Sequence, residues 1–218
     1  MIDNMVSFFK RIIRPLLTTK APVVEELKRD DNSIIYEWEK QGKPAPPPHI
    51  IKQKAILQAK KASGYNILIE TGTYLGEMIE SQKNTFRIIY SIELGHDLHI
   101  AAKAKFKKEA HINLLEGDSG KILKVLMPQI KEPAIFWLDG HYSGGITAKG
   151  DKDCPIFEEL TAILNADKLP HILMIDDARL FNGADGYPTV AELNSFIRTF
   201  TTAFKQEIEN DIISISLF

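Results

Sequence analysis

Five short apolar segments, each ending in an acidic residue, constrain the fold of this chain more than any other feature. They cover residues 66–70, 86–93, 112–116, 134–139 and 171–176, and segments with helical periodicity separate them. Strands that alternate with helices in this way are typical of βαβ units, in which the strands lie parallel in one sheet. The sequence therefore predicts an α/β fold with a mostly parallel sheet.

The remaining segments complete this pattern. Helices are expected at residues 50–62, 76–83, 97–108, 121–127, 155–165 and 189–200. Thr189 and Glu192 have the spacing of a capping box, which marks the start of the last helix. Residues 204–209 and 212–218 read as two strands joined by a hairpin at Asn210-Asp211. The hairpin adds an antiparallel member to the sheet.

The first 48 residues differ from the rest and are expected to form a helical extension with a connector, followed by one domain at residues 49–218. Residues 5–17 have an amphipathic helical pattern, residues 33–40 suit a short helix, and residues 42–48 contain four prolines. The amphipathic segment suits peripheral contact with a membrane, or packing on the domain or on a second subunit of a homodimer. Both interpretations stay open.

Composition narrows the classes of partner and compartment. The 218 residues have a formal net charge of −2 and no long basic stripe, so nucleic acid is not an expected partner. The single cysteine, Cys154, allows no disulfide within the chain, and no apolar run is long enough to span a bilayer. We expect a cytoplasmic protein.

The ends of the strands carry the functional signal. Acidic and glycine residues at or just after these ends are Glu70, Glu93, Gly117-Asp118-Ser119, Asp139-Gly140-His141 and Asp176-Asp177. An unpaired buried carboxylate is costly, so these residues are poor choices for a core. Because the carboxyl ends of parallel strands meet at one edge of a sheet, a shared ligand cleft explains them better than five unrelated turns.

The segment Glu70-Thr71-Gly72-Thr73-Tyr74-Leu75-Gly76 turns from the first strand into a helix. Gly72 permits a sharp turn, and Gly76 permits close packing of the helix. The segment resembles the glycine motif of the Rossmann-like (class I) S-adenosylmethionine-dependent methyltransferases, except that Tyr74 stands where many members have glycine. The resemblance covers about residues 50–218 and implies a three-layer α/β/α sandwich with a seven-stranded sheet and S-adenosyl-L-methionine as cofactor.

The same resemblance implies which residues bind the cofactor. The loop around Gly72 would approach the amino-acid portion, Glu93 would accept hydrogen bonds from the ribose hydroxyls, and Asp118 would lie beside the adenine. The full implied set is Glu70, Thr71, Gly72, Thr73, Tyr74, Gly76, Glu93, Leu94, Gly117, Asp118, Ser119, Asp139, Gly140 and His141. A nicotinamide or flavin dinucleotide is the alternative, but its G-x-G-x-x-G pattern is incomplete here, and Glu77 would repel a pyrophosphate.

Asp139, Asp176 and Asp177 end two strands that should be neighbours, about 5 Å apart. Carboxylates at that distance repel one another unless a cation or protons intervene, and Mg²⁺ prefers oxygen ligands. The arrangement resembles metal-dependent O-methyltransferases of the catechol and macrolide-sugar types, which hold magnesium at such strand ends. In the alternative interpretation there is no metal, Asp177 caps the next element and Asp139 borders the cofactor.

The expected reaction is methylation of a hydroxyl on a small molecule, such as a sugar, a polyol or an aromatic diol, with assistance from magnesium. His141 is the candidate general base, with a structural role as its alternative, and Asp139 would act beside it. Tyr142 and Lys149 are candidates for contacting the acceptor, and residues 181–187 would shape its pocket. Arg179 would meet an acidic substrate or neutralise the Asp176-Asp177 pair. A catalytically silent cofactor-binding protein and a nicotinamide-dependent oxidoreductase are the alternative functions.

Overall fold

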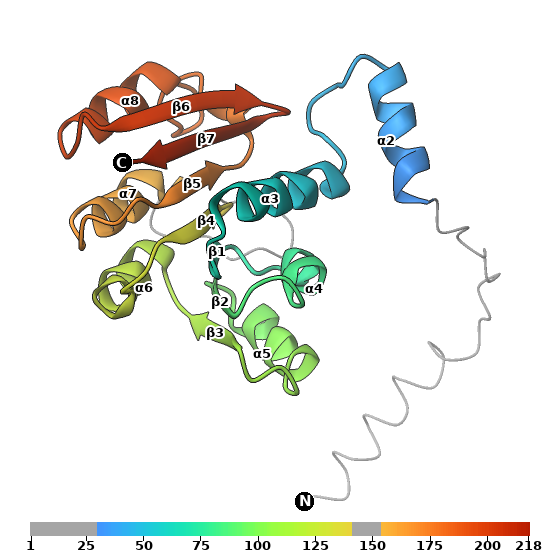
Figure 1. Cartoon of the computed structure of the whole chain (residues 1–218), viewed down its shortest axis with the longest axis horizontal. Coiled ribbons are helices and arrows are strands. Elements are labelled where there is room, and N and C mark those ends of the chain that lie inside the picture. Colours follow the sequence, from blue (N-terminus) through green and yellow to red (C-terminus); the bar gives the residue numbers. More distant parts are fainter. Residues whose placement is uncertain (1–29, 141–153) are drawn as a thin grey trace, which may run out of the picture. The chain divides into compact units, whose positions relative to one another are not determined.

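A computed structural model describes residues 30–140 and 154–218, and residues 35–218 form one compact unit. The unit is built on a seven-stranded sheet of order β3-β2-β1-β4-β5-β7-β6 (Figure 1). The strands are β1 (Ile67–Thr71), β2 (Ile88–Glu93), β3 (Ile112–Glu116), β4 (Ala134–Leu138), β5 (Ile172–Ile175), β6 (Phe204–Glu209) and β7 (Ile212–Leu217).

The first five strands pair in parallel, and β7 runs antiparallel to both β5 and β6. The mostly parallel sheet and the C-terminal antiparallel hairpin are therefore confirmed. The strand order changes direction at β1, which lies between β2 and β4, so a crevice is expected beyond the carboxyl ends of these strands.

Every helix expected after residue 49 is present, with ends displaced by one to three residues. The α-helices are α2 (Asp31–Lys40), α3 (His49–Ser63), α4 (Glu77–Gln82), α5 (His96–Lys105), α6 (Ser119–Leu126), α7 (Ile156–Leu164) and α8 (Val190–Arg198). The capping box of α8 is confirmed, because Thr189 Oγ1 accepts from the Glu192 N–H at 3.1 Å and Glu192 Oε2 accepts from the Thr189 N–H at 2.7 Å. Among the described helices, none is both long and apolar enough to cross a membrane.

Helices cover both faces of the sheet and bury two apolar clusters. Ile67 and Ile69 of β1 point to one face, toward α6, α7 and α8, while Leu68 points to the other face, toward α3, α4 and α5 (Figure 1). Phe136 and Trp137 of β4 divide in the same way, and both are almost fully buried. This gives the three-layer α/β/α sandwich that the resemblance implies.

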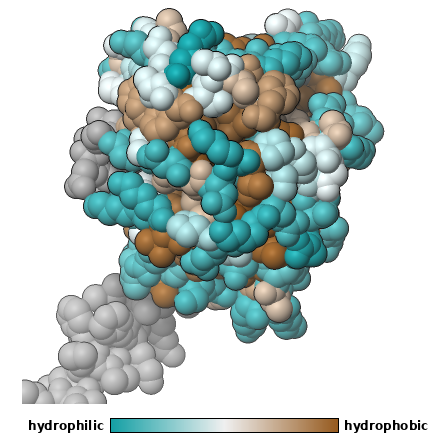
Figure 2. All heavy atoms as spheres, turned by 60° about the vertical axis from the view of Figure 1, so that its left-hand side comes forward, coloured by the Kyte–Doolittle hydropathy of each residue, from teal (hydrophilic) through white to brown (hydrophobic). Residues whose placement is uncertain are grey.

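The side that carries α6, α7 and α8 comes forward in Figure 2, where hydrophobic side chains gather among hydrophilic ones. An open groove of about 850 Å³ lies between α7, α8 and the loop before α8. Its lining includes Phe157 and Phe196, whose ring centroids are 4.6 Å apart, and Tyr187. Tyr187 also lines a small cavity beside Gly140 and Asp176, so the groove adjoins the carboxyl edge of the sheet.

Candidate functional site

The loop after β1 requires glycine at residue 72. Gly72 has a φ of +86°, its N–H donates to the Ile92 carbonyl at 2.9 Å, and a Cβ at this position would lie 2.4 Å from the carbonyl oxygen of Asp139. Such a contact with backbone is far inside van der Waals distance, so any side chain would push β1 and β4 apart. The loop can thus pass between β2 and β4 only without a side chain there.

Glu70 is buried beside this loop, with 2% of its surface exposed. Its Oε2 accepts from Ser91 Oγ at 2.5 Å, and Ser91 Oγ lies 2.6 Å from Thr73 Oγ1. Burial raises the pKa of Glu70 to about 8, with further contributions from Asp139 and Glu93. Glu70 is therefore mostly protonated at neutral pH. Through the hydroxyl groups of Ser91 and Thr73 it links the end of β1 to β2 and to the loop.

Glu93 ends β2 and holds the backbone on both sides of it. Its Oε2 accepts from the Tyr74 N–H and its Oε1 accepts from the Gly95 N–H, each at 2.8 Å. Tyr74 has a φ of +47°, a conformation that glycine adopts at little cost, so the loop keeps a glycine-like turn although the residue is tyrosine. Since a carboxylate offers about four acceptor sites, Glu93 retains capacity for two ligand hydroxyls.

The residues after β3 adjoin the same edge. Gly117 donates its N–H to the Glu93 carbonyl at 2.8 Å, and Asp118 Oδ1 caps α6 by accepting from the Lys121 N–H at 2.9 Å. Ser119 is buried at the start of α6, whereas Leu94 is 38% exposed after β2. The structure therefore brings the predicted residues of β1, β2 and β3 to one edge of the sheet, as the sequence predicts.

Gly76 and Gly140 are both constrained by close packing. A Cβ on Gly76 would lie 2.7 Å from the ring of Phe106, and one on Gly140 would lie 3.0 Å from Glu159 Oε1 and 3.1 Å from Thr71 Oγ1. Thr71 also accepts the Asp139 N–H, through both its carbonyl and its Oγ1 at 3.2 Å. The ends of β1 and β4 are thus held against each other.

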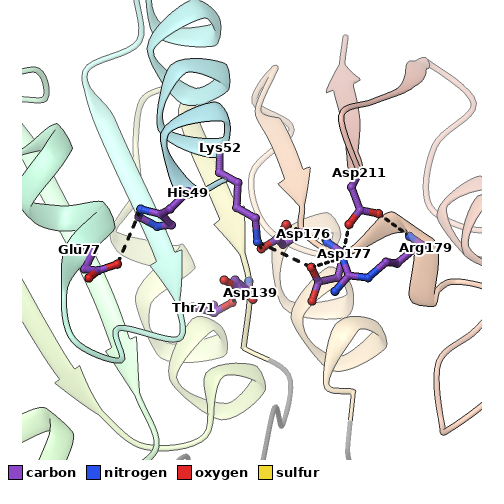
Figure 3. A network of polar contacts seen from close by, with 9 residues as sticks. All are labelled: His49, Lys52, Thr71, Glu77, Asp139, Asp176, Asp177, Arg179 and Asp211. Carbon is purple, nitrogen blue, oxygen red and sulfur yellow. Dashed lines mark hydrogen bonds and ion pairs between the residues drawn. The ribbon is translucent and has the colours of Figure 1, made fainter. Parts of the chain in front are cut away.

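Asp139, Asp176 and Asp177 gather at the ends of β4 and β5 (Figure 3). Asp176 is 2% exposed and Asp177 is 8% exposed. The Asp177 N–H donates to Asp176 Oδ1 at 2.8 Å, and the Asp176 N–H donates to the Leu138 carbonyl at 3.1 Å. The predicted clustering of these carboxylates is present.

Lys52 is the residue of this cluster that sequence reasoning missed. From α3, its Nζ forms an ion pair with Asp176 Oδ2 and lies 3.7 Å from Asp177 Oδ1 (Figure 3). Burial alone would lower the pKa of Lys52, but Asp176, together with Asp139 and Asp177, holds it above its ordinary value. A signal existed: a helix that leads into a parallel strand runs opposite to it, so the first turn of α3 lies at the edge where the strands end.

His49 lies in that same first turn. Its Nδ1 is 2.7 Å from Gln53 Nε2 and 3.9 Å from Glu77 Oε2, and burial lowers its pKa despite the nearby Glu77 (Figure 3). His49 is therefore mostly neutral near pH 7. Sequence reasoning did not single it out either.

Arg179 pairs with two carboxylates. Its Nη1 donates to Asp177 Oδ1 at 2.7 Å and to Asp211 Oδ2, and its N–H donates to Asp211 Oδ1 at 2.8 Å (Figure 3). Of the two roles left open for Arg179, this arrangement favours neutralisation of the aspartate pair.

The described residues do not fit the predicted magnesium site of Asp139, Asp176 and Asp177. In residues 30–140 and 154–218, no group of three or more His, Cys, Asp or Glu is arranged to hold a metal ion. The physical reason is that Lys52 and Arg179 already take up the oxygen atoms of Asp176 and Asp177 that a hard cation would need. His141, Tyr142 and Lys149 lie outside the described residues, as does the segment 5–17.

No protein-family model and no curated protein sequence matches this chain. Solved structures with a similar fold include an O-methyltransferase from Bacillus cereus in complex with S-adenosylhomocysteine (TM-score 0.58, 11% identity, 95% of this chain and 96% of that chain). The S-adenosylhomocysteine-bound methyltransferase PaMTH1 from Podospora anserina has a TM-score of 0.56 and 16% identity over 85% of this chain and 87% of that chain.

The O-methyltransferase TomG from Streptomyces achromogenes, in complex with S-adenosylmethionine, is similar as well (TM-score 0.53, 13% identity, 94% of each chain). The chain therefore has the fold of the class I S-adenosylmethionine-dependent methyltransferases. At these identities the likeness concerns the fold, so activity has to be argued from the site.

Proposed function

We propose that this protein is an S-adenosylmethionine-dependent methyltransferase that methylates a hydroxyl group of a small molecule. The observation that carries the proposal is Glu93, buried at the end of β2 and fixed by the N–H groups of Tyr74 and Gly95. A carboxylate held in this way can accept both hydroxyls of a ribose ring. Its place beside β1, in a sheet of the same architecture as cofactor-bound methyltransferases, supports this assignment.

The first strand and its loop would hold the amino-acid portion of the cofactor. Gly72 lets the loop pass close to the end of β4, where a side chain would clash, and the protonated Glu70 keeps a charge from being buried under the loop. Asp118 and Ser119 at the start of α6 would border the adenine. When bound, the cofactor would supply a methyl group on a sulfonium, which would pass to an acceptor oxygen and leave the sulfur as a neutral thioether.

The acceptor side would lie at β4 and β5. His141, which follows Asp139 and Gly140, stays the candidate base that removes the proton from the acceptor hydroxyl. The groove lined by Phe157, Tyr187 and Phe196 adjoins this side and supports an acceptor with an apolar part. An assisting magnesium ion would have to displace Lys52 from Asp176, so it is not included in the proposal.

Calorimetry with S-adenosylhomocysteine and with NADH tests the cofactor, followed by an acceptor panel with S-adenosylmethionine that carries a labelled methyl group. We expect one bound S-adenosylhomocysteine per chain, no binding of NADH, and label transfer to at least one sugar, polyol or aromatic diol. Glu77, in the first turn of the six-residue α4, disfavours the pyrophosphate of NADH. Binding of NADH alone would contradict the proposal, and cofactor binding without transfer to any acceptor would favour a silent binding protein.

A further inference from the structure

The acidic cluster at β4 and β5 contains its own cation. Lys52 lies in α3, which precedes β1 in the sequence, whereas Asp176 and Asp177 follow β5. Its ammonium group nevertheless contacts Asp176 and lies 3.7 Å from Asp177. Its side chain is 14% exposed, and the side chain of Asp176 is 1% exposed. A pair this deeply buried is not a surface ion pair that solvent screens, so it is part of how the site is built.

The charges near this pair are partly balanced without a metal. Lys52 and Arg179 supply two cations that contact the carboxylates of Asp176, Asp177 and Asp211, and Asp139 adds a fourth carboxylate beside them. The described side chains of this cluster therefore keep a residual negative charge, which attracts a positively charged sulfonium. A divalent ion would have to enter against both cations.

Asp139 lies within the electrostatic reach of Lys52, and Figure 3 shows Lys52 extending toward Asp176 with Asp139 beside it. The ammonium thus stands where the spacing of the three aspartates predicts magnesium. We propose that Lys52 is the resident cation of this site, that it occupies the place of a divalent metal between Asp139, Asp176 and Asp177, and that the protein binds its cofactor without added metal.

This inference rests on the proposed function, because it concerns the acceptor side of the same cleft, but its central test needs no methyl acceptor. The full chain is treated with EDTA, freed of the chelator and titrated with MnCl₂ as a stand-in for Mg²⁺, and free Mn²⁺ is followed by electron paramagnetic resonance. We expect no stoichiometric binding of Mn²⁺ to the wild type.

Variants of Lys52 sharpen the test. Lys52→Met leaves Asp176 without its cation and Asp177 with Arg179 alone, and the variant should acquire one Mn²⁺ site, which adding Asp177→Asn should remove. Lys52→Arg keeps the charge and should bind no Mn²⁺. Lys54→Met, the same substitution at an exposed position of the same helix, should behave as the wild type.

Stoichiometric Mn²⁺ binding by the wild type that Asp177→Asn abolishes would overturn the proposal, and so would a folded Lys52→Met protein that binds no Mn²⁺. If Lys52→Met fails to fold, Mn²⁺ binding by the wild type and by Lys52→Arg still tests the proposal, because neither protein should bind the ion. Calorimetry with S-adenosylhomocysteine, in EDTA and in MgCl₂, separates this inference from the proposed function. Equal affinity for S-adenosylhomocysteine in both buffers supports the inference, and binding only with MgCl₂ overturns it. If the ligand binds in neither buffer, the proposed function is overturned while the Mn²⁺ result stands.

Discussion

The two halves of the carboxyl edge hold their carboxylates in different ways. At β1 and β2, Glu70 accepts from the Ser91 hydroxyl and Glu93 accepts from two backbone N–H groups. At β4 and β5, Asp176 and Asp177 are held by the cations of Lys52 and Arg179. Glu70 is mostly neutral because it keeps its proton, and the backbone N–H groups fix Glu93 without cancelling its charge, whereas the cations at β4 and β5 cancel the charges that they contact. The first half is therefore suited to recognising ligand hydroxyls, and the second is suited to setting the charge around a reaction.

Gly72 joins the two halves, so its substitution should have the largest effect. Gly72→Ala places a Cβ 2.4 Å from the Asp139 carbonyl and should destabilise the fold by about 4 kcal/mol. Urea unfolding measures this loss. Gly64→Ala is the matched control, because Gly64 also has a positive φ (+75°) but has no atom within 4 Å of the added Cβ. Equal losses in both variants would show that backbone conformation, and not the contact between the halves, restricts residue 72.

The half at β4 and β5, where cations hold the carboxylates, is tested by removing the buried ammonium group of Lys52. Lys52→Met leaves Asp176 without its partner and should lower the free energy of unfolding by about 3 kcal/mol. Lys52→Met combined with Asp176→Asn should recover much of that loss, because no uncompensated charge then remains. Guanidinium unfolding at neutral pH measures both proteins, and Lys54→Met is the control. If Lys52→Met were as stable as Lys54→Met, the ion pair would be unimportant to the fold.

The half at β1 and β2 should make the stability of the protein depend on pH, through Glu70. The pKa of Glu70 rises from 4.5 to about 8 on folding, so the folded protein retains a proton that the unfolded chain loses. Stability from this group is fully present below pH 4.5 and is lost as the pH rises toward 8, by on the order of 5 kcal/mol. Glu70→Gln should remove this decline in urea unfolding measured from pH 5 to pH 8. An unchanged slope in that variant would contradict the role of burial at Glu70.

Substitution of Tyr74 by glycine should have the smallest effect of these changes, and it should stabilise the protein instead of destabilising it. Its φ of +47° is costly for a residue with a Cβ, so Tyr74→Gly should raise the free energy of unfolding by about 1 kcal/mol. Tyr74→Ala keeps the Cβ and should bring no gain. Thermal unfolding of the two variants against the wild type measures the difference, and a loss of stability in Tyr74→Gly would show that the exposed tyrosine ring has a stabilising contact.

The sequence predicts the framework well because its signals are local. The bounds of β3 and β6 match those expected, and Thr189 with Glu192 places the start of α8, since alternation, turns and capping depend on residues close in the chain. The gathering of acidic residues at one edge follows from the same reasoning, because parallel strands bring their ends together.

The partners of those acidic residues could not be read in the same way. Lys52 lies 124 residues from Asp176, and periodicity within α3 does not show which carboxylate a lysine will meet. Without that partner, three neighbouring aspartates indicate a metal ion, whereas with it they indicate an internally paired cluster. The positive φ of Tyr74 could not be predicted from the sequence either, because tyrosine rarely adopts this conformation, whereas glycine often does.

A crystal structure of the protein with S-adenosylhomocysteine, grown without added metal, tests the central claim most directly. The account predicts the ribose hydroxyls within hydrogen-bonding distance of Glu93, with Lys52 still paired to Asp176 beyond the sulfur atom. A ligand bound elsewhere, or a Glu93 side chain turned away from the ribose, would contradict it.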